Sequence, residues 1–210
     1  MKKFLGNLLI VVLVVVGLGL VFNSQITSWW VGYQGGQKAS SITKQEAKRG
    51  NQRKGDYNFS NVKAVDENAI MKSTKAKQSP AIGRIKIPDL KVDLPIFKGL
   101  NDDDLTIGAG TMKMDEKMGE KNYVLAGHHM KNPDVLFSPL SRAKVGQKIY
   151  LSNPSKKYTY KITSKKIVSE NDISVINDNG NQKEITLVTC ASGNPGETRR
   201  LIVSGELVKS

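Results

Sequence analysis

Three side chains suited to acyl transfer stand at the ends of predicted strands: the Cys190 thiol, the His128 imidazole and the Arg200 guanidinium. Cys190 is the only cysteine of the chain and follows the strand-like run of residues 184–189. A thiolate is a nucleophile, an imidazole exchanges protons with it and with a leaving group, and a guanidinium stabilises an oxyanion. These residue types together predict a cysteine hydrolase or transferase.

Two of these residues have a neighbour of the same type, so the choice between them needs an argument. His129 follows His128, and Arg199 precedes Arg200. Side chains alternate between the two faces of a strand, so Arg200 faces away from the core if Leu201 faces into it. The same alternation favours His128. Arg199 and His129 remain the alternatives.

A metal centre is not indicated by the residue types. One cysteine and two adjacent histidines do not supply a tetrahedral set of zinc ligands. The acidic run at residues 102–104 is better interpreted as a solvated loop or as the start of a helix. We therefore expect no metal among the site residues and no required cofactor.

The N-terminus carries an apolar segment of the kind that crosses a membrane. Residues 4–22 are almost uninterruptedly apolar, and about 20 such residues span a bilayer core. A cleaved signal peptide is the alternative, but its apolar region is usually shorter and ends in an Ala-x-Ala-like site, which is missing here. Lys2 and Lys3 precede the run and no Lys or Arg follows before Lys38, which predicts a cytoplasmic N-terminus. We expect residues 1–25 to form a cytoplasmic tip and a single-pass anchor in the cell membrane, with the remainder extracellular.

Residues 26–80 are expected to form a juxtamembrane stalk. The segment is polar and poor in branched apolar residues, so it cannot build a core alone. Helix is indicated within it around residues 42–49 and 66–72. Three aromatic residues near its start suit the membrane–water interface, namely Trp29, Trp30 and Tyr33.

The net charge of +13 is concentrated just outside the predicted membrane segment. Residues 36–80 carry ten Lys or Arg and four Asp or Glu. Such a basic stretch favours contact with an anionic leaflet or with anionic wall polymers. Export and the absence of a basic helix or aromatic nucleic-acid motif argue against a nucleic-acid partner. A single cysteine also excludes an internal disulfide and marks a candidate reactive thiol in an exported chain.

From residue 81 onward the chain consists of short apolar–polar alternations separated by turn residues. We expect strands at residues 82–88, 92–97, 122–126, 148–152, 157–164, 184–190 and 201–208, with residues 165–170 either continuing the strand before them or beginning another. A helical turn is expected at 105–109 and a short helix at 134–143. Many short strands indicate an all-β barrel or sandwich, and a segment of this length can bury a core. Residues 81–210 are therefore expected to form the catalytic domain.

The motifs in this order resemble the signature of the sortase family. The sequence Thr-Leu-Val-Thr-Cys occupies residues 186–190, with Ala-Gly-His at 126–128 before it and Arg-Leu-Ile-Val at 200–203 after it. The segment 83–88, Gly-Arg-Ile-Lys-Ile-Pro, is similar to the first strands of that family. The resemblance covers residues 81–208 and is greatest to class A, the housekeeping sortases.

The resemblance implies a closed β-barrel of eight strands with short helices and the activity of a cysteine transpeptidase. Such enzymes cut a Leu-Pro-x-Thr-Gly (LPxTG) sorting signal between Thr and Gly, hold the product as a thioester, and pass it to an amine of the peptidoglycan precursor lipid II. This reaction anchors surface proteins to the cell wall. By position, Cys190 is implied as the nucleophile, His128 as the acid/base and Arg200 as the donor to the oxyanion or substrate backbone. The implied substrate-binding residues are Ala126, Val175, Ile176 and Val188.

Two departures from family patterns refine this expectation. Some class A sortases bind calcium through acidic residues before the histidine strand and in the loop before the cysteine strand. Lys113 stands where the first acid falls by ungapped counting, although Glu116, Glu120 and Asp178 remain, so the sequence argues against calcium activation. The predicted stalk also lacks the Asp-Pro-aromatic lid motif of pilus-building sortases, which favours wall anchoring over pilin polymerisation.

Two other classes of protein are the alternatives. An L,D-transpeptidase also uses Cys and His on a β-rich scaffold, but residues 188–192 do not match its Ser-x-Gly-Cys-Arg-like context. A membrane-tethered, non-catalytic wall-binding protein fits the basic stalk and the β domain. It has no need, however, of a lone thiol between a His motif and an Arg motif.

Overall fold

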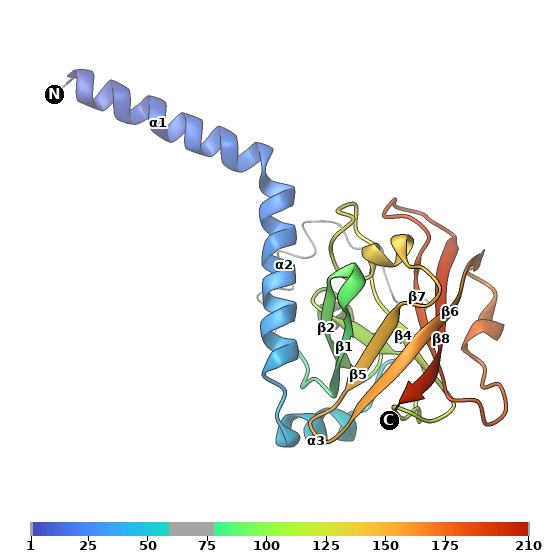
Figure 1. Cartoon of the computed structure of the whole chain (residues 1–210). Helices are drawn as coiled ribbons and strands as arrows, with labels where there is room; N and C mark the ends of the chain where they lie inside the picture. Colours follow the sequence, from blue (N-terminus) through green and yellow to red (C-terminus); the bar gives the residue numbers. More distant parts are fainter. Residues whose placement is uncertain (1, 59–77, 210) are drawn as a thin grey trace.

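The computed structural model describes residues 2–58 and 78–209. Its centre is a closed β-barrel with the strand order β1-β2-β3-β4-β7-β8-β6-β5. Helices α1 and α2 lie outside the barrel, and α2 runs along its side (Figure 1). The predicted closed barrel of eight strands is thereby confirmed.

The elements of the described residues follow the expected pattern of short strands. The strands are β1 (Gly83–Ile87), β2 (Val92–Phe97), β3 (Ala109–Thr111), β4 (Asn122–Ala126), β5 (Lys148–Ser152), β6 (Lys157–Ser169), β7 (Glu184–Cys190) and β8 (Arg199–Lys209). The helices are α1 (Lys2–Val21), α2 (Asn23–Ser40), α3 (Lys44–Gln52) and α5 (Asp102–Leu105), with 3₁₀ turns η2 (Pro88–Leu90), η3 (Ser138–Arg142) and η4 (Ile173–Ile176).

The barrel interior is filled by one set of alternating side chains. Leu125 of β4, Leu187 of β7 and Val203 of β8 are completely buried in this interior cluster. A second, smaller apolar cluster lies on the outer face of the same three strands and includes Val124 and Ile202. The strands that carry the candidate site therefore have apolar side chains on both faces. Other segments of the chain pack against the outer face.

The structure differs from the sequence-based expectation at a few short elements. β3 was not predicted, because three residues are too few to show a period of two; it is held parallel to β2 and antiparallel to β4. The helical turn expected at residues 105–109 begins earlier, as α5, because the Asn101 side chain caps it by accepting a hydrogen bond from the Asp103 N–H. The helix expected at residues 134–143 is the shorter 3₁₀ turn η3.

Part of the predicted stalk packs against the barrel. Helix α3 confirms the helix expected around residues 42–49, whereas the one expected at 66–72 lies outside the described residues. Val31 of α2 is completely buried within the main core cluster, and Glu46 of α3 accepts a 3.1 Å hydrogen bond from the Ala81 N–H. The polar composition concealed this packing because only a few small and apolar side chains make the contact.

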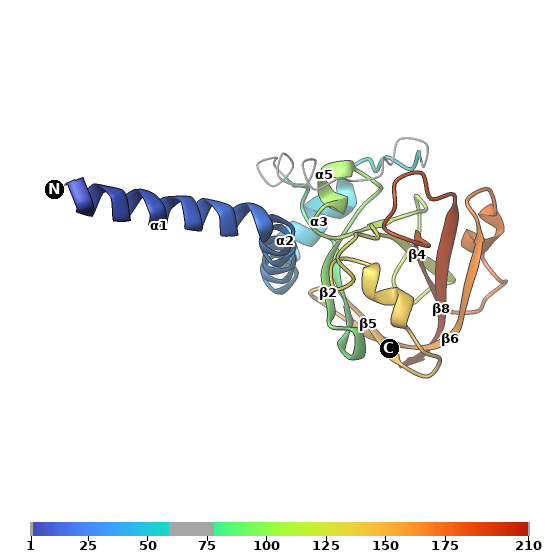
Figure 2. The ribbon, with the colours of Figure 1, turned by 90° about the horizontal axis from the view of Figure 1, so that it is seen from above.

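Helix α1 projects away from the barrel, as the view from above shows (Figure 2). Its described apolar side chains, such as Leu13 and Val15, are largely exposed. Across residues 2–58 and 78–209, no helix combines the length and the apolar character needed to cross a membrane.

Candidate active site

A groove of about 580 Å³ runs over the outer face of β4, β7 and β8. It is bounded on one side by η4 and on the other by the loop between β7 and β8. The residues predicted from the sequence all line this one groove: Ala126, His128, Val175, Ile176, Val188, Cys190 and Arg200. Residues far apart in the sequence meet there because β4 pairs with β7 and β7 pairs with β8.

The register of β7 and β8 places the thiol beside the guanidinium. Cys190, the last residue of β7, is the cross-strand partner of Arg200. Leu201 is buried inside the barrel, so Arg200 faces outward, as the alternation argument predicted. Arg199 does not line the groove; its guanidinium instead donates a 3.0 Å hydrogen bond to the carboxylate of Glu197.

The guanidinium of Arg200 is held by acceptors from two elements. Its Nη2 donates a 2.8 Å hydrogen bond to the Glu170 carboxylate, just after the end of β6. Its Nη1 donates 2.8 Å and 3.2 Å hydrogen bonds to the backbone carbonyls of Glu197 and Arg199. These contacts fix the planar fork of the side chain at the rim of the groove.

His128 follows the end of β4 and lies against the barrel wall. The preceding Gly127 allows this approach, because a Cβ there would come within 2.7 Å of the Phe137 ring. His128 is 8% exposed, and burial lowers the pKa of its imidazole to about 4. The Nε2 atom of His128 and the hydroxyl of Thr189 are buried without a hydrogen-bond partner among the described residues. His128 lines the groove, so its Nε2 atom lies beside the space that a polar group would enter, whereas Thr189 pairs with Leu201 of the interior cluster.

The second histidine has a different position. Nδ1 of His129 lies 2.7 Å from the backbone carbonyl oxygen of Cys190. A carbonyl oxygen only accepts, so this ring nitrogen carries the hydrogen. His129 does not line the groove, and its contact fixes the end of β7 that presents the thiol.

The thiol of Cys190 is half-buried, and its surroundings keep it protonated. Burial raises its pKa, the charge of Arg200 lowers it, and the carboxylates of Glu197 and Glu170 raise it. Burial lowers the pKa of His128 and raises the pKa of Cys190, so it favours the neutral form of both groups. Such a pair becomes reactive when the thiol proton moves to the imidazole and leaves a thiolate.

The apolar part of the groove extends the set predicted from the sequence. Val188 and Ile202 form its floor with Val168, while Leu105 and Met112 cover one end. Both β4 and β7 are buried on both faces, and the apolar run at residues 123–126 of β4 was the available sequence signal for this burial, whereas the threonines of β7 interrupt such a run. Glu170 also lines the groove, but no local pattern distinguished it from a solvated carboxylate at the end of a strand.

Polar contacts from two residues hold the η4 segment beside the groove. The buried Asn122 side chain donates hydrogen bonds to the carbonyls of Val175 (3.3 Å) and Asn177 (3.0 Å) and accepts one from Thr186 (2.9 Å). Asp178, a few residues further on, forms an ion pair with an ammonium group at a nitrogen–oxygen distance of 2.6 Å. The wall formed by η4 is thus tied to β4 and to the turn before it.

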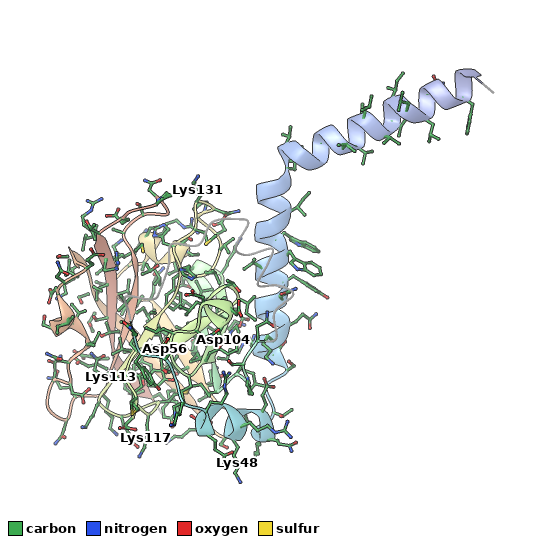
Figure 3. The ribbon with its side chains drawn as sticks, turned by 180° about the vertical axis from the view of Figure 1, so that it is seen from behind. Lys48, Asp56, Asp104, Lys113, Lys117 and Lys131 are labelled. Atoms are coloured by element: carbon green, nitrogen blue, oxygen red, sulfur yellow. The ribbon has the colours of Figure 1, made fainter. Side chains whose placement is uncertain are left out.

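That ammonium belongs to Lys113, which is labelled in Figure 3, and its partner Asp178 is one of the acidic residues considered as calcium ligands. Glu116 is engaged by the backbone, accepting hydrogen bonds from the N–H groups of Met112 (3.0 Å) and Val124 (2.6 Å). Within residues 2–58 and 78–209, no three or more His, Cys, Asp or Glu side chains are grouped so that they could hold a metal ion.

Comparison with known proteins agrees with this geometry. The sortase domain family matches residues 85–208. The chain is 42% identical to sortase A of Streptococcus agalactiae serotype III (strain NEM316), over 99% of this chain and 86% of that protein. It is 36% identical to sortase A of Listeria monocytogenes serovar 1/2a (strain ATCC BAA-679 / EGD-e), over 95% of this chain and 90% of that protein.

The fold shows the same relationship. The crystal structure of Listeria monocytogenes sortase A superimposes with a TM-score of 0.59 and 41% identity, covering 61% of this chain and 88% of that one. A Clostridium perfringens sortase D5 transpeptidase gives a TM-score of 0.55 at 26% identity, covering 69% of this chain and 89% of that one. With a family match over most of the chain and sortase A relatives along nearly its full length, the protein belongs to the sortase family, in class A.

Proposed function

We propose that Cys190, His128 and Arg200 carry out the transpeptidation by which this class A sortase anchors surface proteins to the cell wall. The observation that supports these roles most directly is the cross-strand pairing of Cys190 with Arg200 in a groove that His128 also lines. The groove joins a nucleophile, a proton acceptor and an anion-stabilising fork to an apolar floor. This is the set of groups that acyl transfer through a thioester needs.

The substrate is an LPxTG sorting signal lying in the groove. Its Leu and Pro side chains pack against the apolar residues Ala126, Val175, Ile176 and Val188. Cys190 passes its proton to His128, and the sulfur then forms a bond with the carbonyl carbon of the Thr residue. The resulting oxyanion is stabilised by the N–H groups of Arg200.

Collapse of this intermediate breaks the bond between Thr and Gly. His128 returns its proton to the departing glycine amine, and the Thr acyl group stays on Cys190 as a thioester. An amine of lipid II then attacks the thioester, and its proton passes through His128 back to the Cys190 sulfur. The products are a new amide and the regenerated thiol.

The protein is placed at the cell membrane by its N-terminal segment. Residues 4–22 act as a single-pass anchor, residues 26–80 continue outside, and residues 81–210 form the extracellular catalytic domain. Support comes from the apolar sequence of the segment and from Lys2 and Lys3 on its cytoplasmic side. Sorting signals and lipid II are both membrane-linked, so attachment brings the groove to its substrates.

The reaction proceeds without a cofactor, and calcium is not required. The ammonium of Lys113, paired with Asp178 at 2.6 Å, supplies the positive charge that a cation would otherwise bring to the η4 segment. Glu116 is satisfied by backbone N–H groups. Neither carboxylate therefore needs a metal ion to balance it.

A peptide-transfer assay tests the function. The full chain in detergent is incubated with an LPxTG peptide and an excess of hydroxylamine, and the products are identified by mass spectrometry. We expect cleavage after Thr with capture of the acyl group, and no product from Cys190→Ala, which should still bind peptide. Binding without turnover in the unaltered, folded protein would favour the non-catalytic wall-binding alternative.

A further inference from the structure

Helix α2 has one face that is fixed to the barrel. Val31 and Ala39, two turns apart, are both buried. Between them lies Gly35, where a Cβ would come within 2.7 Å of the carbonyl oxygen of Ile107. At Gly35, helix α2 therefore lies too close to the backbone between α5 and β3 to admit a side chain, and the helix also contacts β1 and β2. Helix α2 is therefore packed against the barrel along one face and is not a flexible tether.

The opposite face of α2 carries an exposed apolar stripe. Its members recur at the spacing of one helix face, and they are between 44% and 66% exposed: Phe22, Ile26, Trp29, Trp30 and Tyr33. The Trp29 and Tyr33 rings stack with a centroid separation of 5.6 Å. Figure 3 shows ring side chains on the side of α2 away from the barrel. The stripe ends at Tyr33, because the next positions on that face are the polar Gln37 and Ser40.

Helix α1 leaves α2 toward the side to which this stripe points. In both Figures 1 and 2, α1 turns sharply from the start of α2 and projects away from the barrel. A bilayer that contains α1 therefore lies against the outer face of α2. Charge is compatible with this arrangement, because residues 23–40 contain Lys38 and no Asp or Glu. A net positive charge attracts anionic headgroups.

We propose that α2 lies along an anionic lipid surface, with Trp29, Trp30 and Tyr33 among the headgroups, and thereby holds the barrel against the membrane. Trp and Tyr suit this depth because their rings are apolar and carry one polar atom. The inference rests on the proposed membrane attachment through residues 4–22. A docked α2 fixes the height and orientation of the barrel relative to the membrane, whereas a flexible stalk would leave both free.

This docking leaves the groove accessible. In the closed barrel, two strands separate β2 from β7 on one side, and two separate β1 from β8 on the other. The face that contacts α2 is therefore across the barrel from the strands that carry Cys190 and Arg200. The η4 segment, orange in Figure 1, likewise lies on the side of the barrel remote from α2 (Figures 1 and 2).

The position of Gln37 distinguishes a lying helix from an upright one. It is 15 residues beyond Phe22 on the same face, so an upright α2 would lift it about 22 Å above the end of α1 at a rise of about 1.5 Å per residue. The full chain with Cys190→Ala and Gln37→Cys is labelled with a fluorophore. It is then reconstituted into phosphatidylcholine–phosphatidylglycerol vesicles that contain a headgroup-spin-labelled lipid quencher. A matched label at Ile173→Cys, exposed on η4, is the control.

We expect the Gln37 label to be quenched several-fold more strongly than the Ile173 label. Equal, weak quenching in chains that co-float with the vesicles would overturn the docking while leaving membrane attachment intact. Failure to co-float would refute the attachment itself and the docking with it. Shielding of the Gln37 label that grows with protein concentration in lipid-free detergent would assign the stripe to a second copy of the chain and overturn the proposal.

A functional measurement accompanies the structural one. The combined change Trp29→Ser, Trp30→Ser and Tyr33→Ser should leave cleavage of a soluble LPxTG peptide unchanged. It should lower, several-fold, the rate on the same signal tethered to a vesicle. The combined change Val145→Ser and Val208→Ser, at exposed apolar positions of the barrel, is the control and should alter neither rate. Equal rates on the tethered signal for all three proteins would contradict the docking.

Discussion

Arg200 donates a 2.8 Å hydrogen bond from Nη2 to Oε2 of Glu170, so the guanidinium opposite Cys190 is already paired in the free protein. The Glu170 side chain contributes a carboxylate to the rim of the groove from just beyond the end of β6. A substrate carbonyl or oxyanion must share or displace this partner before it receives both N–H groups of the fork. Glu170 therefore acts on the reaction through Arg200 and through its own charge.

Removing the Glu170 charge should make the thiol more acidic. Burial raises the pKa of Cys190, the charge of Arg200 lowers it, and the carboxylates of Glu197 and Glu170 raise it, so Glu170→Gln removes one of the raising influences while burial and Glu197 remain. We expect the rate of Cys190 alkylation by iodoacetamide at about pH 8 to rise about threefold. Glu206→Gln, the same change on an exposed side of β8, is the control. An unchanged pH profile of alkylation in Glu170→Gln would show that Glu170 has no electrostatic influence on the thiol.

The strands of the barrel could be predicted from the sequence because they are amphipathic and end at turn residues. β2, β4, β5 and β7 have the expected bounds, since local alternation and the interior packing favour the same register. The meeting of Cys190 with Arg200 depends on the antiparallel pairing of β7 and β8, which no pattern within either strand specifies.

Contacts between segments that are distant in the sequence could not be predicted in this way. The ion pair between Glu170 and Arg200 joins residues 30 positions apart, and nothing local marks Glu170 as its partner. The packing of α2 was hidden for a similar reason, because Gly35 contributes to it by lacking a side chain. The residue types of a segment indicate which of its side chains are buried, but they do not indicate which other segment those side chains contact.

Asn122 should control substrate affinity through the η4 wall. Its side chain holds the carbonyls of Val175 and Asn177, and it is almost completely buried. Asn122→Ala leaves those carbonyls unpaired, at a cost of about 1–3 kcal/mol in stability. We expect the KM for an LPxTG peptide to rise several-fold with little change in kcat, measured below the lowered melting temperature. Asn179→Ala, which removes an exposed side chain of the same segment, should leave KM unchanged. If kcat fell several-fold while KM stayed unchanged, Asn122 would not act by forming the wall of the groove.

Lys113 should make the enzyme independent of calcium. Its ammonium holds Asp178 at 2.6 Å and lowers the pKa of that carboxyl, so the segment is tethered without a divalent ion. We expect the activity of the unaltered protein to be the same in EDTA and in millimolar calcium. Lys113→Glu reverses the charge beside Asp178, and its KM should rise several-fold in EDTA and fall again when calcium is added. Lys117→Glu, an exposed neighbour outside the tether, is the control. Loss of activity of the unaltered protein in EDTA would refute this interpretation.

The half-buried Glu116 should make the barrel less stable as the pH rises through neutrality. Burial raises the pKa of this carboxyl to about 7, although the N–H groups of Met112 and Val124 donate to it. The native state then binds a proton that the unfolded chain releases at its ordinary pKa of about 4.3. This contribution is complete below about pH 4.3 and is lost as the pH rises through about 7, by up to about 4 kcal/mol.

Thermal unfolding of the unaltered protein and of Glu116→Gln between about pH 5 and pH 8 measures this contribution. The glutamine does not titrate, so the difference between the two melting curves isolates the carboxyl from every other group. Glu116→Gln is expected to be the less stable variant at pH 5, because its amide N–H groups face backbone donors that the carboxyl accepts from. The gap should narrow toward pH 8 as the native carboxyl becomes charged inside the barrel wall. A constant gap across this range would mean that Glu116 is ionised throughout, held so by its backbone donors and by Lys113.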